Sequence, residues 1–500
     1  MKKKVKIYNL ILVIFLLVGI IGCEEDFLET TPTTSISDQD VFKTTKGAQT
    51  VLNGVYRWMR EFNSGGTERH EDMGQKSIDI TLDVLDGRDV MLAKFNWYVF
   101  DYFLTRDYTQ SNLPKVRGIW QFYYKIINNC NNVIVNIAEA EGSESEKNRI
   151  KGEALGLRAY AYFYLVNIFQ HAYSVNSNAA GVPIYLKPAT PESKGNPRGT
   201  VKAVYDQILS DLTTAVGLLP ENGKRINKSN INISVVNGLL ARTYLFMERY
   251  SDAITAARAA RVGYPLADQA TYASGFNDYS NEEWIWGLPF QKDQQHYYYS
   301  FFSFYDLERS AGYSHFRMND SFYDLFSTTD VRAKLVVGDY SLVVYKADPP
   351  INRPGYANVA DSLVMRKFRD KPDQTGHYVM MRSAEMILIE AECKAELGQN
   401  EDAQDLLYEV QHRADQNAVK SNNVGQDLID EILLERRKEL YGEGLASVLD
   451  LKRKNLPLVR TGNQFAPGSL PAGSNKLVWQ IPKAEIDNND NIKISDQNPL

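Results

Sequence analysis

Aromatic side chains beside amides are the residues of this chain whose chemistry best suits ligand binding. Aromatic faces stack on flat C–H surfaces such as those of sugar rings, and neighbouring amides or acids bond to hydroxyl groups. Residues 297–299 are three consecutive tyrosines. Such a run fits neither a helical stripe nor one face of a buried strand, so at least one of the three should be exposed. In the alternative interpretation, these rings pack under the loops as a satellite core. The candidate ligand-binding residues are Asn96, Trp97, Tyr98, Tyr102, Tyr297, Tyr298 and Tyr299.

Acidic residues offer a second kind of chemistry. Glu435 and Glu439 could supply the paired carboxylates of a glycoside hydrolase. They share one face of a predicted helix with arginines between them, so ion pairing is the favoured interpretation. The aspartates of residues 79–89 could bind a cation or sugar hydroxyls, but their spacing does not fit an EF-hand. Solvated loop acids are the favoured interpretation there.

Motifs for metal, nucleotide or nucleophilic chemistry are not found in the sequence. The six histidines are scattered, and no Walker A loop, G-x-S-x-G or G-x-G-x-x-G is present. Cys130 and Cys393 each lie within helical apolar periodicity, which predicts two separate buried thiols rather than a disulfide. We therefore predict no catalytic residue, no metal ligand and no cofactor.

The first residues have the pattern of an exported lipoprotein. Residues 1–22 have four lysines near their start, which an apolar stretch follows. This pattern is typical of a signal peptide, and the stretch is short for a transmembrane helix. Gly22-Cys23 follows that stretch and resembles a bacterial lipobox, which implies cleavage before Cys23 and lipidation of Cys23. An ordinary secretory signal is the alternative. The acids of residues 24–26 resemble a surface-export signal of Bacteroidetes lipoproteins, and they also suit a solvated tether.

Composition limits the class of protein. The 500 residues are 44% hydrophobic and 24% charged, which excludes a polytopic membrane protein, and 11% aromatic, which excludes a disordered chain. The formal net charge is −6, and no long basic run follows the first six residues. Nucleic acid is therefore not expected as a partner.

Helix pairs are the elements that must position these groups. Ala241 and Ala253 lie twelve residues apart around a predicted tight turn, and Ala391 and Ala403 repeat that arrangement. Small residues at these positions let paired helices approach closely, as in tetratricopeptide repeats. Ser251 and Asn400 are placed to cap the second helix of each pair. Generic helical hairpins also favour alanine.

The predicted fold is mostly α, with tetratricopeptide-like helix pairs as a scaffold, long loop-rich insertions and a few short strands. A lipidated tether spans 23–39, and a single domain spans 40–500. Loops on a rigid scaffold are the usual place for binding residues. The scaffold is predicted at about 40–62, 119–262 and 382–445, with loop-rich, ligand-facing regions at about 63–118 and 264–380.

Short motifs along nearly the whole chain resemble one family. The chain is similar to the SusD/RagB family of Bacteroidetes outer-membrane nutrient-binding lipoproteins. One departure is Ala446, where the family usually has arginine. The motifs that carry the resemblance are Asp26-Phe27-Leu28-Glu29, Leu52-Asn53-Gly54-Val55-Tyr56, Leu157-Arg158-Ala159-Tyr160, Gly181-Val182-Pro183-Ile184, Arg382-Ser383-Ala384-Glu385-Met386, Glu435-Arg436-Arg437-Lys438-Glu439-Leu440, Gly442-Glu443-Gly444 and Ile481-Pro482.

The resemblance implies a location, a partner and a ligand. It implies a lipid-anchored protein on the outer membrane that faces outward and covers a SusC-like TonB-dependent barrel. It implies capture and delivery of an oligosaccharide or similar nutrient without cleavage. Family members also use aromatic and asparagine residues from the region of Asn96 and Trp97.

Two other classes of function remain open at this point. A secreted glycoside hydrolase would need two opposed carboxylates in a cleft. A helical-repeat scaffold that binds only proteins would not need aromatic-rich loops, whereas this chain concentrates aromatic residues in two of them.

Overall fold

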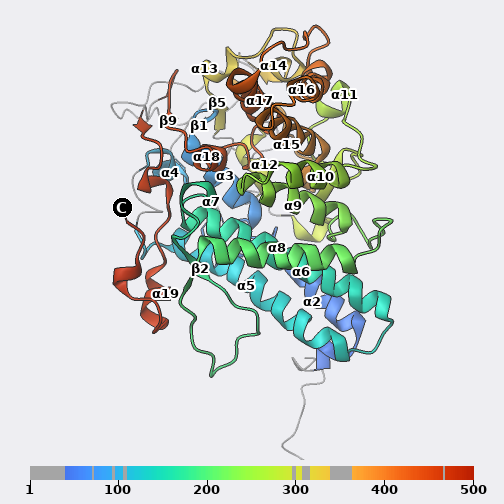
Figure 1. The fold of residues 1–500 in the computed structure, drawn as a ribbon, viewed down its shortest axis with the longest axis vertical. Helices are drawn as coiled ribbons and strands as arrows, with labels where there is room; N and C mark the ends of the chain where they lie inside the picture. The colour runs from blue at the N-terminus through green and yellow to red at the C-terminus, as the bar shows by residue number, and fades with distance from the viewer. Residues whose placement is uncertain are drawn as a thin grey trace, which may run out of the picture.

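A computed structural model of the chain describes residues 40–69, 72–92, 96–104, 110–295, 300–306, 316–337, 363–464 and 468–499. These residues are mostly helical, as predicted, and Figure 1 shows the helices stacked beside irregular segments. The predicted signal peptide, tether and Cys23 lie outside the described residues. Within the ranges given above, every helix is too short or too polar to cross a bilayer.

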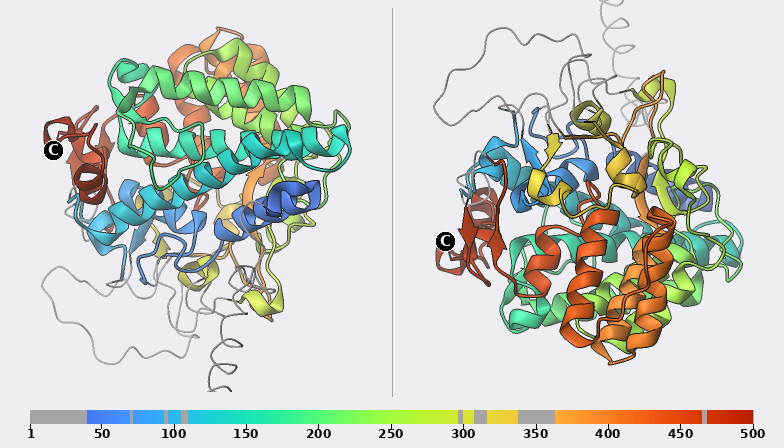
Figure 2. Two further views of the ribbon diagram at one scale, coloured as in Figure 1. Left: turned by 90° about the horizontal axis from the view of Figure 1, so that it is seen from below. Right: turned by 90° about the horizontal axis from the view of Figure 1, so that it is seen from above.

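The scaffold is a row of helices, each packed on the next. Its members pack in the order α5, α6, α8, α9, α10, α15 and α16, and α17 covers the α15–α16 pair. Figure 2 shows the row from below and from above. The bounds are α2 (Thr45–Trp58), α5 (Pro114–Asn136), α6 (Glu144–Phe169), α8 (Val201–Leu218), α9 (Ile233–Phe246), α10 (Tyr250–Ala260), α15 (Ser383–Glu396), α16 (Asn400–Ala414) and α17 (Gly425–Glu439).

The repeat predicted from alanine spacing is confirmed as two helix–turn–helix units, α9–α10 and α15–α16. All four alanines are fully buried. Two residues after the end of each first helix lies a residue with positive φ, Glu248 at 58° and Gly398 at 73°. The next backbone N–H then bonds five residues back, Arg249 to Tyr244 at 2.9 Å and Gln399 to Lys394 at 2.8 Å. This pattern is a Schellman motif, which turns the chain sharply into the second helix.

Helix starts follow local sequence signals in some places and depart from them in others. Ser143 and Glu146 form a capping box at the start of α6, and Thr200 caps α8 as predicted. The predicted caps of the second repeat helices are wrong. Helix α10 begins at Tyr250, two residues earlier than a Ser251 cap requires, and α16 begins at Asn400, one residue earlier than expected; neither has a side-chain cap.

Helix α3 (Gln75–Asp86) lies inside the segment that was predicted to be loop-rich. Every residue of α3 is buried, including Asp79, Asp83 and Asp86. The prediction that these aspartates are solvated loop acids is therefore wrong. Burial on all sides removes the polar face from which a surface helix is recognised.

Short elements surround the scaffold. In the described residues the strands form five separate two-stranded antiparallel ladders: β1 (Val90–Leu92) with β5 (Phe316–Met318), β2 (Ala180–Pro183) with β3 (Arg198–Thr200), β4 (Trp284–Leu288) with β8 (Tyr378–Arg382), β6 (Val336–Val337) with β7 (Val364–Met365), and β9 (Leu458–Val459) with β10 (Ser469–Leu470). The short helices are α4 (Val99–Tyr102), α7 (Tyr173–Asn176), α11 (Gln269–Tyr272), α12 (Phe301–Tyr305), α13 (Asp320–Tyr323), α14 (Val331–Lys334), α18 (Val448–Arg453) and α19 (Lys483–Asn488).

The core extends through the scaffold and under the short elements. Helix α6 is buried on all sides along most of its length, and Arg158 on it pairs with the buried Asp211 of α8 at 2.6 Å. Cys130 and Cys393 are separate buried thiols, which confirms the sequence prediction. The helices that carry candidate site residues are therefore held on a rigid base.

Candidate functional site

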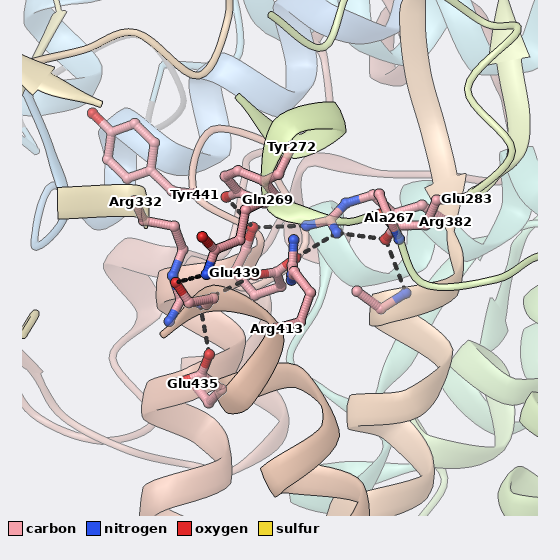
Figure 3. Close-up of polar contacts among 12 residues, drawn as sticks. Ala267, Gln269, Tyr272, Glu283, Arg332, Arg382, Arg413, Glu435, Glu439 and Tyr441 are labelled. Atoms are coloured by element: carbon pink, nitrogen blue, oxygen red, sulfur yellow. Dashed lines mark hydrogen bonds and ion pairs between the residues drawn. The ribbon is translucent and has the colours of Figure 1, made fainter. Parts of the chain in front are cut away.

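The acids that could have formed a hydrolytic pair lie in a buried ionic cluster. Arg382 on β8 contacts Glu283 at 2.8 Å and Glu439 at 2.7 Å, and Arg332 contacts Glu435 at 2.6 Å and Glu439 at 3.1 Å. Figure 3 shows these side chains converging from α17, β8 and the segment before β4. The predicted ion pairing of Glu435 and Glu439 is confirmed.

The cluster also fixes the charge of its members. Burial alone would raise the pKa of Glu439, but Arg413, Arg382 and Arg332 hold that pKa well below its usual range. Burial likewise opposes ionisation of Glu443, yet Arg382 and Lys367 lower its pKa to about 2. These carboxylates are therefore ionised and paired, and the cluster joins α17 to the β4–β8 ladder.

Helix α15 contributes three other glutamates, and each of them also pairs with arginine. Glu385 accepts two bonds of 2.7 Å from Arg242 of α9. Glu390 pairs with Arg258 of α10 and with Arg261, the residue directly after α10, and Glu392 pairs with Arg453 of α18. Each pair links neighbouring helices, so these acids serve the scaffold.

The first predicted ligand stretch is divided between the surface and the core. The side chain of Trp97 is 39% exposed, with the Arg69 guanidinium 5.6 Å from its ring centre. Asn96 is largely buried; its Oδ1 accepts a bond of 2.8 Å from the Tyr98 backbone N–H. Its Nδ2 has no hydrogen-bond partner among the described residues. Trp97 is thus the aromatic face that this stretch offers to a ligand.

Tyr98 and Tyr102 are fully buried, so the exposure predicted for them is wrong. Phe304 contacts the Tyr98 ring edge-on at 5.4 Å between ring centres. The Tyr102 hydroxyl donates to Gln464 at 3.2 Å. Both rings lie on or beside the short helix α4 and pack into the core, as the alternative interpretation expected. Tyr297, Tyr298 and Tyr299 lie outside the described residues.

A large cavity that the sequence did not predict lies between α5 and the loop of residues 184–197, here called the roof loop. Its volume is about 860 Å³, within the range of small-molecule sites. Figure 1 shows the roof loop extending from β2 beside α5 and α19. Aromatic rings reach the cavity from separate segments: Trp58 from α2, Trp120 and Tyr124 from α5, and Tyr185 from the roof loop.

Asparagines of α5 hold the roof loop through its backbone. Asn131 Nδ2 donates to the carbonyls of Tyr185 at 3.0 Å and Lys187 at 3.1 Å. Asn128 Oδ1 accepts from the Ala189 N–H at 2.8 Å. The Tyr185 N–H donates to the Tyr162 hydroxyl at 2.7 Å. The cavity is therefore formed before any ligand arrives, which lowers the entropy cost of binding.

The cavity was missed because its rings follow a helical stripe. Trp120 and Tyr124 lie four residues apart on α5, a spacing typical of a helix face that packs in the core, and Trp120 is only 4% exposed. The available signal was the asparagine-rich end of α5. Asparagine is a poor helix former, and its amide here bonds to a loop instead of to solvent.

The loop of residues 63–69 contacts both the cavity and the exposed ring of Trp97. The Asp72 carboxylate accepts bonds from the backbone N–H groups of Gly65 at 2.8 Å and Thr67 at 3.1 Å. Gly65 lines the cavity, and Arg69 lies over Trp97. One loop on the helical scaffold therefore contacts both the exposed tryptophan and the aromatic cavity.

Comparison with known proteins places this scaffold in a family. A SusD-like family model, described as starch-binding and associating with the outer membrane, matches residues 26–245. A SusD family model matches residues 338–500. The chain belongs to the SusD/RagB family, which confirms the resemblance seen in the sequence.

Individual relatives agree with this assignment. A SusD-like protein of Formosa agariphila is 24% identical over 302 residues, which cover 58% of this chain and 53% of that protein. A SusD-like protein of Bacteroides ovatus is 24% identical over 230 residues, covering 45% of this chain and 36% of that protein. The matches thus span about half or less of the length of these relatives. A solved SusD-like carbohydrate binding protein of Bacteroides vulgatus has a TM-score of 0.79 and 29% identity, covering 91% of this chain and 98% of that one.

Proposed function

We propose that this protein captures an oligosaccharide or a related nutrient at the cell surface and delivers it, uncut, to a SusC-like TonB-dependent barrel of the outer membrane. Its membership of the SusD/RagB family carries the proposal. The solved relative from Bacteroides vulgatus, described as carbohydrate binding, supports a glycan as ligand.

The proposed capture surface centres on Trp97. Its partly exposed ring offers a stacking face, and the adjacent Asn96, whose amide Nδ2 is buried, stays in the proposed site on the sequence pattern. The tyrosines at positions 297–299 remain part of the proposed site. Stacking on an aromatic face with an amide beside it is a combination that suits a sugar ring.

The proposed anchor is the lipid on Cys23, with residues 1–22 removed as a signal peptide. Two acyl chains hold a protein on a membrane far better than one. Replacement Cys23→Ser should move the protein from the membrane fraction to the soluble fraction. A variant that stays fully membrane-bound would show that Cys23 is not the anchor.

Delivery to a barrel is tested by co-purification. The protein, extracted in detergent from cells grown on the inducing glycan, should bring down a TonB-dependent barrel in near-equal amount. Recovery of no barrel under these conditions would contradict the partnership.

A binding protein should also leave its ligand intact. Calorimetric titration of the mature chain with a panel of oligosaccharides should identify a ligand, and chromatography after prolonged incubation should recover it at its original length. Shortened products that are absent with heat-inactivated protein would instead favour the hydrolase alternative.

A further inference from the structure

The cavity under the roof loop carries a charge opposite to that of the whole chain. Lys125, Lys187 and Lys194 line it, and all three are exposed. None of their ammonium groups makes an ion pair within the described part of the chain. The chain as a whole has a net charge of −6. Three unpaired lysines around one concavity therefore create a local positive potential.

One acid, Glu485, also lines the cavity, so its four charged side chains sum to +2, and Glu485 pairs with none of the lysines. Glu485 Oε2 accepts from Trp120 Nε1 at 3.2 Å, and Glu485 Oε1 accepts from Asn489 Nδ2 at 2.8 Å. Both oxygens are thus committed to neutral donors of the wall. Glu485 holds α19 against α5, and the lysines remain available to a ligand.

Rings of the cavity offer apolar faces beside these charges. Tyr124 and Tyr185 are partly exposed and meet edge-to-face, with 5.7 Å between ring centres. The Tyr124 hydroxyl donates to the Pro183 carbonyl at 2.8 Å, which fixes the ring. Lys125 Nζ lies 3.4 Å from the centre of the Trp58 ring. A ligand that places an anionic group near Lys125 would therefore also meet Trp58.

We propose that this cavity is a second saccharide site, which binds an acidic oligosaccharide. Its pyranose faces would pack on Tyr124 and Tyr185, and its carboxylate or sulfate groups would pair with Lys125, Lys187 and Lys194. Aromatic faces and cations in one preformed concavity match the apolar faces and fixed anionic charges of such a chain. A neutral oligosaccharide leaves the three ammonium groups without a partner, so the site prefers the acidic one.

This second site rests on the proposed function only in that its ligand is a saccharide. Trp97 does not line the cavity, so the two surfaces can be tested separately. The test uses the mature full-length chain and calorimetry with three probes: an oligogalacturonate hexasaccharide, a chondroitin sulfate hexasaccharide and maltohexaose. The first two distinguish carboxylate from sulfate as the anionic group, and the third is the neutral control.

Binding of at least one anionic probe is expected, and it should weaken at high salt because the lysines are solvated. The triple variant Lys125→Gln, Lys187→Gln, Lys194→Gln should weaken that binding about tenfold or more. The matched control replaces three exposed lysines outside the cavity, Lys46→Gln, Lys224→Gln and Lys334→Gln, and should bind as the wild type does. Both variants must melt at the wild-type temperature.

Two results would overturn the second site. The first is that neither anionic probe binds. The second is that an anionic probe binds equally to the wild type and to the cavity triple variant, whether or not Trp97→Ala abolishes that binding. After either result, the proposed function would still stand if a neutral oligosaccharide binds in a Trp97-dependent manner or if a barrel co-purifies. The proposed function itself would fail if no neutral oligosaccharide binds and no barrel co-purifies.

Discussion

Arg382 and Glu439 form a fully buried ion pair, with 2.7 Å between Nη1 of the arginine and Oε1 of the glutamate. Arg382 is the last residue of β8, directly before α15, and Glu439 is the last residue of α17. The Arg382 Nη2 group also donates to the Glu439 carbonyl at 2.7 Å. The pair therefore ties the end of the scaffold to the strands beside it.

Replacement Arg382→Met should lower the free energy of unfolding by about 3–5 kcal/mol, because it leaves buried carboxylates without their cation. Denaturant unfolding followed by circular dichroism measures the loss. The control is Lys202→Met, which breaks an exposed pair with Asp206 and should change the stability by less than about 1 kcal/mol. Equal effects of the two replacements would contradict the importance of the buried cluster.

Glu248 and Gly398 occupy equivalent turns but differ in conformational cost. A glutamate with positive φ is strained, whereas glycine is not. Replacement Glu248→Gly should therefore stabilise the protein by about 0.5–1 kcal/mol. Gly398→Ala should destabilise it by about 1 kcal/mol although a Cβ there meets no atom within 4 Å. Chemical denaturation measures both, and a destabilising Glu248→Gly would refute the equivalence of the two turns.

Lys452 on α18 should make stability depend on pH. Burial lowers the pKa of its amine from 10.5 to about 7, and its Nζ donates to the Asn167 carbonyl. Between pH 7 and about 10.5, the unfolded chain then holds a proton that the folded chain lacks. The contribution of Lys452 to the free energy of unfolding should therefore rise with pH in this window, by up to about 1.4 kcal/mol per unit.

The variant Lys452→Met removes this dependence. The stability of the variant minus that of the wild type should fall as pH rises from about 7.5 to about 9.5, because only the wild type gains over this interval. Other titrating groups contribute equally to both proteins and cancel in the difference. A difference that stays constant across the interval would show that the Lys452 amine is not perturbed.

Trp97→Ala should weaken binding of the glycan identified by titration by roughly 1–3 kcal/mol, or about 10- to 100-fold, by analogy with stacking of bases on aromatic rings. The melting temperature is the folding control, because the Trp97 side chain is only 39% exposed and its truncation also removes buried contacts. Tyr408→Ala, a partly exposed aromatic of α16, serves as the control. Wild-type affinity in a folded Trp97→Ala variant would remove Trp97 from the site and leave the family assignment intact.

The scaffold was predictable because its signals are local. Paired alanines and helical periodicity identified α9–α10 and α15–α16, and motif order identified the family. Helix α3 was not predictable in the same way. The sequence pattern of its aspartates is typical of surface acids, whereas the structure buries them. Burial, together with the charges of Asp79 and Asp86, raises the pKa of Asp83 well above its usual range. Helical spacing brings these aspartates to one side of α3, but only tertiary contacts bury them.

The binding surfaces were less predictable than the scaffold. Composition identified an aromatic stretch, but not that Trp97 faces outward while Tyr98 and Tyr102 face the core, since all three lie within six residues. The cavity depends on the roof loop reaching α5, and Asn131 and Ala189 are far apart in the sequence. Periodicity describes which face of a helix is apolar and does not report which distant loop covers that face.

The attachment of the roof loop separates its shape from its side-chain chemistry. Asn131 and Asn128 bond to backbone groups of Tyr185, Lys187 and Ala189, so these attachments do not depend on which side chains positions 187 and 189 carry. Exposed positions such as Leu186 and Lys194 are therefore open to substitution during evolution without loss of folding. A bacterium that encounters a new nutrient could retune this cavity by single codon changes while it keeps the same framework.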